Sequence, residues 1–106
     1  MKFGIVICSD DPETVWNALR LGNFALKEGD EVRTFLMAKG VQIESLDNSK
    51  FQIDEQLNAY IDNNGKIFAC GTCLKMRQID GSEKCPISTM KDLYEIIKDC
   101  DKVISF

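Results

Sequence analysis

The sequence predicts a single α/β domain over residues 1–106, with three layers: a mostly parallel sheet of four to five strands and helices on both faces. The length fits one hydrophobic core. Strand-like apolar runs alternate with amphipathic helical segments along the chain. The first run, Phe3 to Cys8, is apolar almost throughout, as in a parallel strand covered on both faces. In such a sheet, ligand sites lie at the carboxyl ends of the strands.

The composition is that of an ordinary globular protein and narrows the classes of partner. Hydrophobic residues make up 44% of the chain and charged residues 28%, and no apolar run is long enough to cross a bilayer. The net charge of −4, without a basic stripe, argues against a stable nucleic-acid partner. The strand-like start has no secretory cleavage pattern, so we expect a cytoplasmic protein without a membrane partner.

The first strand is followed by a helix with clear end signals. Asp11 can cap the helix and Pro12 suits its first position, while Gly29 is a natural stop. Between these ends, apolar residues recur at spacings of four, three and four, which predicts one buried face: Val15, Leu19, Gly22 and Leu26.

A second strand is expected at Val32 to Ala38, followed by a polar segment from Lys39 to Lys50. The polar segment is predicted to be a long loop with one helical turn at Val41 to Leu46. Loops of this length are often lids or binding segments. A tolerated surface insertion is an equally good interpretation.

The rest of the chain continues the alternation of helices and strands. An amphipathic helix with Ile53, Leu57, Tyr60 and Ile61 precedes a strand that ends at Cys70. The remaining elements are expected as a short helix at Thr72 to Gln78, a loop at Asp80 to Ser88, a helix around Met90 to Ile97 and a strand at Lys102 to Phe106.

The motif C-x-x-C, formed by Cys70 and Cys73, is the strongest candidate site. It lies at a strand-to-helix junction, where unpaired amides and the helix dipole favour an anion. This position predicts that Cys70 is a nucleophile of low pKa and that Cys73 is a resolving or modulating thiol. The alternative is that both are small buried apolar residues.

Four neighbouring residues are candidates for binding the substrate. Gly71 allows close approach of the backbone, and the amides from Gly71 and Thr72 onward can donate to an anion. Lys75 and Arg77 add positive charge nearby.

A zinc site built from cysteines is an alternative to the thiol site. The chain has five cysteines and no histidine, which excludes Cys-His and Ser-His-Asp catalysis. Zinc held by Cys70, Cys73, Cys85 and Cys100 is disfavoured because the last two are isolated, so we expect neither metal nor cofactor. Cys8 is expected in the core, Cys85 at the crevice or the surface, and Cys100 at the opposite end.

Three further site types fit the sequence less well. The stretch Ser9-Asp10-Asp11 resembles the magnesium pair of receiver domains, but the third strand ends in Cys70 instead of aspartate. Two aspartates would also repel a flavin phosphate. A thioredoxin-like motif usually follows an early strand with Trp before it and Pro inside it, unlike the late C-G-T-C found here.

Four stretches in order resemble the DsrE/DsrF-like family of sulfur-relay proteins (TusD-like): M-K-F-G-I-V-I-C-S, N-F-A-L-K-E-G-D-E-V, F-A-C-G-T-C-L-K-M-R and D-C-D-K-V-I-S-F. The resemblance implies a small α/β domain that assembles into homo-oligomers, trimers or hexamers. It also implies that Cys70 accepts sulfane sulfur as a persulfide. Several members have no second cysteine where this chain has Cys73, which leaves a disulfide switch open.

We therefore expect a sulfur carrier or sulfurtransferase-type subunit that receives sulfur on Cys70 and passes it to an acceptor thiol. Its partners would be sulfur donor and acceptor proteins. Two alternatives stay open: a non-catalytic oligomeric binding or adaptor protein of the same fold, and a thiol-disulfide redox protein that uses Cys70 and Cys73.

Overall fold

A computed structural model describes all residues 1–106 and confirms the α/β class. The five strands form one all-parallel sheet in the order β4-β3-β2-β1-β5. Their bounds are β1 Lys2–Ile7, β2 Glu31–Leu36, β3 Lys66–Cys70, β4 Ile87–Ser88 and β5 Lys102–Ser105.

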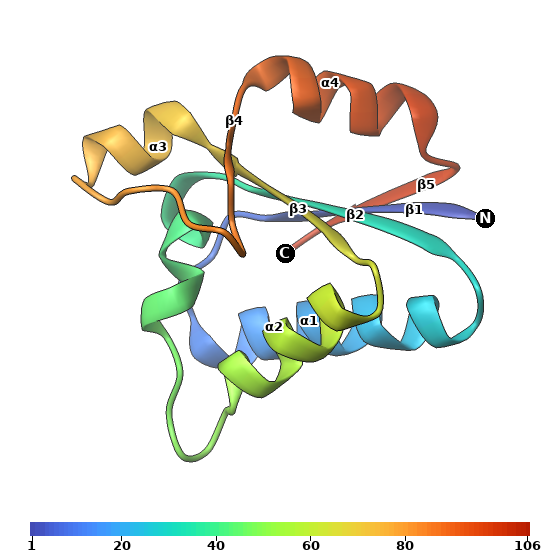
Figure 1. Ribbon diagram of the computed structural model, residues 1–106, viewed down its shortest axis with the longest axis horizontal. Coiled ribbons are helices and arrows are strands. Elements are labelled where there is room, and N and C mark those ends of the chain that lie inside the picture. Colours follow the sequence, from blue (N-terminus) through green and yellow to red (C-terminus); the bar gives the residue numbers. More distant parts are fainter.

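Helices cover both faces of this sheet (Figure 1), as expected. On one face lie α1 and α2, which pack against each other, and on the other lie α3 and α4. The helical segments are α1 Pro12–Lys27, the 3-10 segment η1 Ala38–Ser45, α2 Ile53–Asp62, α3 Gly71–Met76 and α4 Met90–Asp99. The strands β1 to β4 are added toward one edge of the sheet, and the connection through α4 then places β5 beside β1 at the other edge.

The start of α1 follows the sequence signals closely. The Asp11 carboxylate accepts from the backbone N–H of Thr14 at 3.0 Å and from its hydroxyl at 2.9 Å. These bonds lower the pKa of Asp11, the backbone bond contributing most. Asp11 therefore acts as a helix cap, as expected, which accounts for the acidic pair without a metal.

The face covered by α1 and α2 is closed around Tyr60. The Tyr60 hydroxyl lies 2.8 Å from Thr34 Oγ1 and within 3.2 Å of the carbonyl oxygens of Val32 and Lys66. The ring is fully buried, and a Cβ on Gly65 would lie 2.4 Å from it. Tyr60 therefore joins α2 to both β2 and β3, and its ring fills the space that the glycine leaves.

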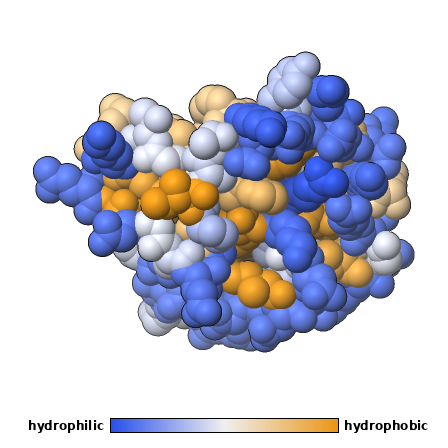
Figure 2. All heavy atoms as spheres, turned by 45° about the horizontal axis from the view of Figure 1, so that its top comes forward, coloured by the Kyte–Doolittle hydropathy of each residue, from blue (hydrophilic) through white to orange (hydrophobic).

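The face covered by α4 is less complete. Only Ile96 of α4 is fully buried, while Tyr94 is 61% and Ile97 55% exposed. Val103 and Ile104 of the edge strand β5 are also exposed. Figure 2, turned to bring this side forward, shows orange hydrophobic groups among blue hydrophilic ones. The second face of the sheet thus leaves apolar surface in water.

Two elements differ from the sequence-based expectation. The helical part of the long loop, η1, runs over Ala38–Ser45 and is longer than the single turn expected. The absence of a side chain at Gly40 lets η1 pack closely against the end of β1, since a Cβ there would lie 2.1 Å from the carbonyl oxygen of Ile7. The strand β4 has only two residues, Ile87–Ser88, within the segment expected to be a loop. Pairing with Ala69 and Cys70 creates this strand, and no local pattern reveals it.

No helix of the protein combines the length and the apolar character that crossing a membrane would require.

Candidate functional site

Cys70 is the last residue of β3 and caps the helix α3 that follows at once. Its Sγ accepts a hydrogen bond from the backbone N–H of Cys73 at 3.4 Å. The side chain is buried, with 4% of its surface exposed. The strand-to-helix junction predicted from the sequence is therefore present, and the two residues of the C-x-x-C motif are in direct contact.

Cys73 lies one turn along α3 and is partly exposed. Its Sγ accepts the backbone N–H of Ala38 at 3.2 Å. Ala38 is the first residue of η1, two positions after the end of β2, and has a φ of 50°, in the left-handed region that non-glycine residues seldom adopt. The contact joins the carboxyl ends of β2 and β3 through a sulfur atom.

The pKa of Cys70 corrects one prediction. Burial raises the pKa of this thiol, and a side-chain contact with Cys73 raises it further. Backbone N–H groups of Cys73 and Thr72 act in the opposite direction and are outweighed. The low pKa predicted from the helix start is therefore wrong, because α3 has only six residues and desolvation of a buried thiolate exceeds its effect.

The four predicted substrate-binding residues fall into two groups. Gly71 and Lys75 line an open hollow of about 440 Å³ beside α3, together with Ile87. Arg77 ends α3, and its Nη1 donates to the carbonyl oxygen of Cys73 at 3.2 Å instead of to a sulfur. Thr72 is exposed, and its backbone N–H faces Cys70. The Arg77 guanidinium group therefore lies near Cys73, while Lys75 lines the hollow.

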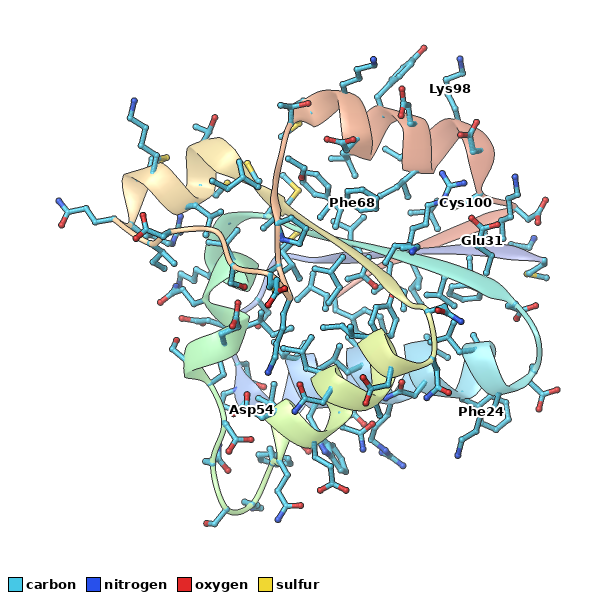
Figure 3. The ribbon with its side chains drawn as sticks, viewed as in Figure 1. Phe24, Glu31, Asp54, Phe68, Lys98 and Cys100 are labelled. Carbon is cyan, nitrogen blue, oxygen red and sulfur yellow. The ribbon has the colours of Figure 1, made fainter.

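The remaining cysteines lie apart from the pair. Cys8 is exposed, so the expectation of a core position is wrong: β1 ends at Ile7, and Cys8 begins the turn beyond it. Cys100 lies at the amino-terminal end of the strands, as expected, near Glu31 (Figure 3). The five cysteines are all free thiols.

Cys85 is buried, which decides against the surface position that the sequence left open. Burial raises its pKa to about 12, and contact with the Glu44 carboxylate adds to the shift. The Ser82 hydroxyl donates to the same carboxylate, and Ser82 Oγ accepts the N–H of Cys85 at 3.1 Å. This cluster fastens the loop before β4 onto η1.

The arrangement of thiols and carboxylates does not form a metal site. No three or more cysteine, aspartate or glutamate side chains come together in a way that could hold a metal ion. The four-cysteine zinc site considered for this sequence is therefore not assembled.

Sequence reasoning missed Ala38 altogether. Its contribution is a backbone N–H in a left-handed conformation, and alanine carries no signal for that conformation. The Glu44 and Ser82 partners of Cys85 were also missed, because they come from segments 38 residues apart.

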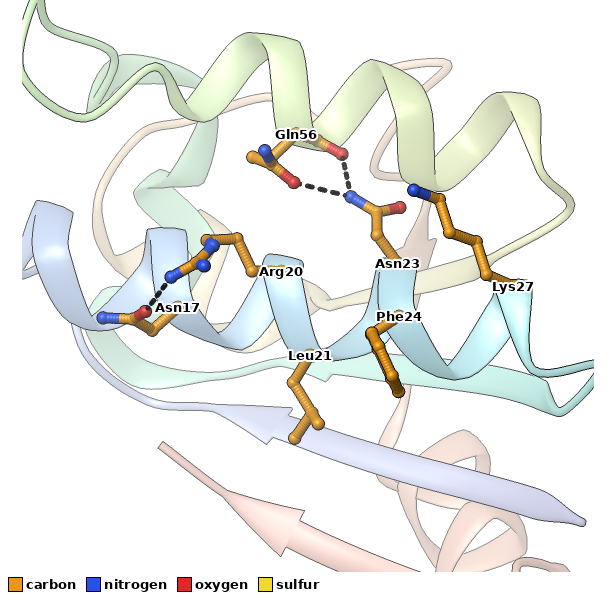
Figure 4. Close-up of a pocket in the computed structure, with 7 residues that line it drawn as sticks. All are labelled: Asn17, Arg20, Leu21, Asn23, Phe24, Lys27 and Gln56. Carbon is orange, nitrogen blue, oxygen red and sulfur yellow. Dashed lines mark hydrogen bonds between the residues drawn. The ribbon is translucent and has the colours of Figure 1, made fainter.

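A second open hollow, of about 430 Å³, lies between α1 and α2 (Figure 4). Asn23 Nδ2 donates there to the carbonyl and side-chain oxygens of Gln56, and Asn23 Oδ1 is buried without a partner. No cysteine lines this hollow, whose residues are Asn17, Arg20, Leu21, Asn23, Phe24, Lys27 and Gln56.

Comparison with known proteins identifies the family of this chain. The "uncharacterized protein MJ0989" of Methanocaldococcus jannaschii is 32% identical over 115 aligned positions, which cover 100% of both chains. The "uncharacterized protein MK0008" of Methanopyrus kandleri is 34% identical over 110 positions, covering 95% of this chain and 91% of its own. A model of the DsrE/DsrF-like family matches residues 1–106. As the resemblance in the sequence indicated, the chain belongs to the DsrE/DsrF-like family.

Proposed function

We propose that this protein is a sulfur carrier that holds sulfane sulfur as a persulfide on Cys70 and passes it to an acceptor thiol. The observation that carries the proposal is the position of Cys70, a buried thiol at the carboxyl end of β3 with the N–H of Cys73 directed at its sulfur. Membership of the DsrE/DsrF-like family supports it. Ligand chemistry in parallel sheets takes place at this end of the strands.

The reaction needs only thiols. The Cys70 thiolate attacks the outer sulfur of a donor persulfide, the donor sulfur–sulfur bond breaks, and the donor leaves as a thiolate. Cys70 then carries S–SH, and an acceptor thiolate removes the outer sulfur in the same way. Burial makes the free thiolate scarce, but it also limits contact between water and the persulfide once it has formed.

The proposed carrier works with sulfur donor and acceptor proteins, in the cytoplasm, where thiols stay reduced. We extend the proposal to a homo-oligomer, the trimer or hexamer that the family resemblance led us to expect. The exposed apolar side chains of α4 and β5 support a contact between copies, among them Tyr94, Ile97 and Val103. Ile97→Asp should then lower the mass measured by light scattering to that of a single chain. An unchanged mass contradicts assembly through this face.

Intact-mass analysis tests the carrier function. The reduced protein is incubated with glutathione persulfide, alkylated and fragmented, and we expect a gain of about one sulfur atom on Cys70. Cys70→Ser removes the persulfide from this position, whereas Cys100→Ser, at the opposite end of the sheet, leaves it unchanged. Wild-type protein that never carries sulfur on Cys70 rules the carrier out and favours the adaptor alternative.

Thiol-disulfide exchange is a second candidate, favoured by the closeness of Cys70 and Cys73, whose backbone N–H donates to Cys70 Sγ. Mild oxidation would then remove two hydrogens from the protein, and either Cys70→Ser or Cys73→Ser would prevent the loss. A redox protein shows this change and forms no stable persulfide, which separates it from a carrier.

A further inference from the structure

The burial of Cys70 raises a question about how it would receive sulfur. With 4% of its surface exposed, its sulfur is poorly placed to meet the persulfide of another protein. Cys73, whose backbone N–H donates to that sulfur at 3.4 Å, is partly exposed. A donor that approaches α3 therefore reaches Cys73 first.

Backbone geometry also holds the Cys73 sulfur in a defined position. Ala38 holds a left-handed conformation and donates its N–H to Cys73 Sγ at 3.2 Å, a shorter contact than the 3.4 Å from Cys73 N to Cys70 Sγ. The guanidinium of Arg77, bonded to the Cys73 carbonyl, adds positive charge nearby.

We propose that Cys73 is the loading residue of the carrier: it takes the sulfur from the donor and hands it to Cys70. The inference rests on the carrier function proposed above and replaces direct attack of Cys70 on the donor by loading through Cys73. It is carried by the different exposure of two neighbouring cysteines and by the Ala38 N–H on the more exposed one.

The two steps balance without an oxidant. First, the Cys73 thiolate attacks the outer sulfur of the donor persulfide, Cys73–S–SH forms, and the donor leaves as a thiolate. Second, Cys70 attacks the outer sulfur on Cys73, its proton passes to the departing Cys73 sulfur, and Cys70–S–SH results. The sulfur moves only between two cysteines that are three residues apart and joined by the hydrogen bond from Cys73 N–H to Cys70 Sγ. Attack on the inner sulfur instead would give a Cys70–Cys73 disulfide and release hydrosulfide.

A loading experiment with two donors tests the order of the steps. The protein-sized donor is serum albumin persulfidated on its free cysteine, and the small donor is glutathione persulfide. We expect Cys73→Ser to lower the rate of persulfide formation on Cys70 from albumin at least tenfold, with a smaller loss from glutathione. Cys70→Ser should trap the sulfur on Cys73, seen by fragment mass after alkylation. Cys8→Ser, which alters an exposed thiol outside the pair, should load like the wild type.

Each result bears on the proposal. If Cys73→Ser loads Cys70 from albumin at the wild-type rate, and Cys70→Ser carries no sulfur, Cys70 is loaded directly and the inference falls while the carrier function stands. If wild-type protein carries no sulfur on Cys70 with either donor, the carrier function itself fails. Hydrosulfide release with loss of two hydrogens overturns the transfer step. Cys73→Ala serves as a second variant, and equal melting temperatures for both variants and the wild type exclude a folding defect.

Discussion

The helices bury the apolar side chains of the two sheet faces to different degrees. Beneath α1 and α2, side chains such as Leu57 and Tyr60 are completely buried and hydrogen-bonded where they are polar. Beneath α4, helix and edge strand leave aromatic and aliphatic groups such as Tyr94 in water. The closed face therefore supplies most of the stability of the single chain, and the open face is available for contact with another molecule.

The largest expected effect comes from shortening one apolar side chain on each face. Leu57→Ala should lower the free energy of unfolding by about 2–5 kcal/mol, since Leu57 is fully buried. Ile97→Ala, on the exposed side of α4, should change it by less than about 0.5 kcal/mol in dilute, dissociated protein. Urea unfolding measures both values, and similar losses for the two variants contradict the comparison.

A smaller effect is expected from removing one hydroxyl group on each face. Tyr60→Phe leaves Thr34 Oγ1 and two carbonyl oxygens without their buried partner and should cost about 1–3 kcal/mol. Tyr94→Phe removes a hydroxyl that has no partner within the chain, so it should be neutral within about 0.5 kcal/mol. Thermal unfolding of both variants provides the measurement, and a neutral Tyr60→Phe would mean that the buried network contributes little.

The smallest effect separates buried from exposed thiols by pH. The pKa of Cys85 is raised from 9.0 to about 12, so the folded protein keeps a proton that the unfolded chain loses. The associated stability is present below pH 9 and is lost as the pH rises toward 12, by about 1 kcal/mol at pH 10.

Urea unfolding at pH 8, 9 and 10, in the presence of a reductant, measures this loss. Cys85→Ala should show a shallower decline with pH than the wild type, whatever its stability at pH 8. Cys8→Ala, which removes an exposed thiol, should decline like the wild type. Parallel curves for all three proteins would show that Cys85 is not protected from deprotonation.

The longer elements and the location of the thiol pair could be predicted from the sequence. The apolar run before Cys8, the Asp11-Pro12 helix start and the strand ending at Cys70 carry local patterns that determine structure directly. The position of Cys70 at the carboxyl end of its strand follows from the strand pattern and the parallel arrangement alone.

What escaped prediction depends on contacts between distant segments. The strand β4 exists because Ile87–Ser88 pairs with β3, and the raised pKa of Cys70 comes from groups that bury it. A helix start is visible in sequence, whereas the depth of a thiol below the surface is not. The N–H of Ala38 at Cys73 likewise depends on where η1 is anchored.

That anchor gives Gly40 an importance out of proportion to its chemistry. Any side chain there would collide with the carbonyl of Ile7 and shift the segment that carries the Ala38 N–H. In a genetic screen for lost sulfur transfer, substitutions of Gly40 should therefore be recovered beside those of the cysteines, although this residue has no reactive group. The positions that do not tolerate mutation would then include the residues that hold Cys70 and Cys73 in place as well as the two cysteines.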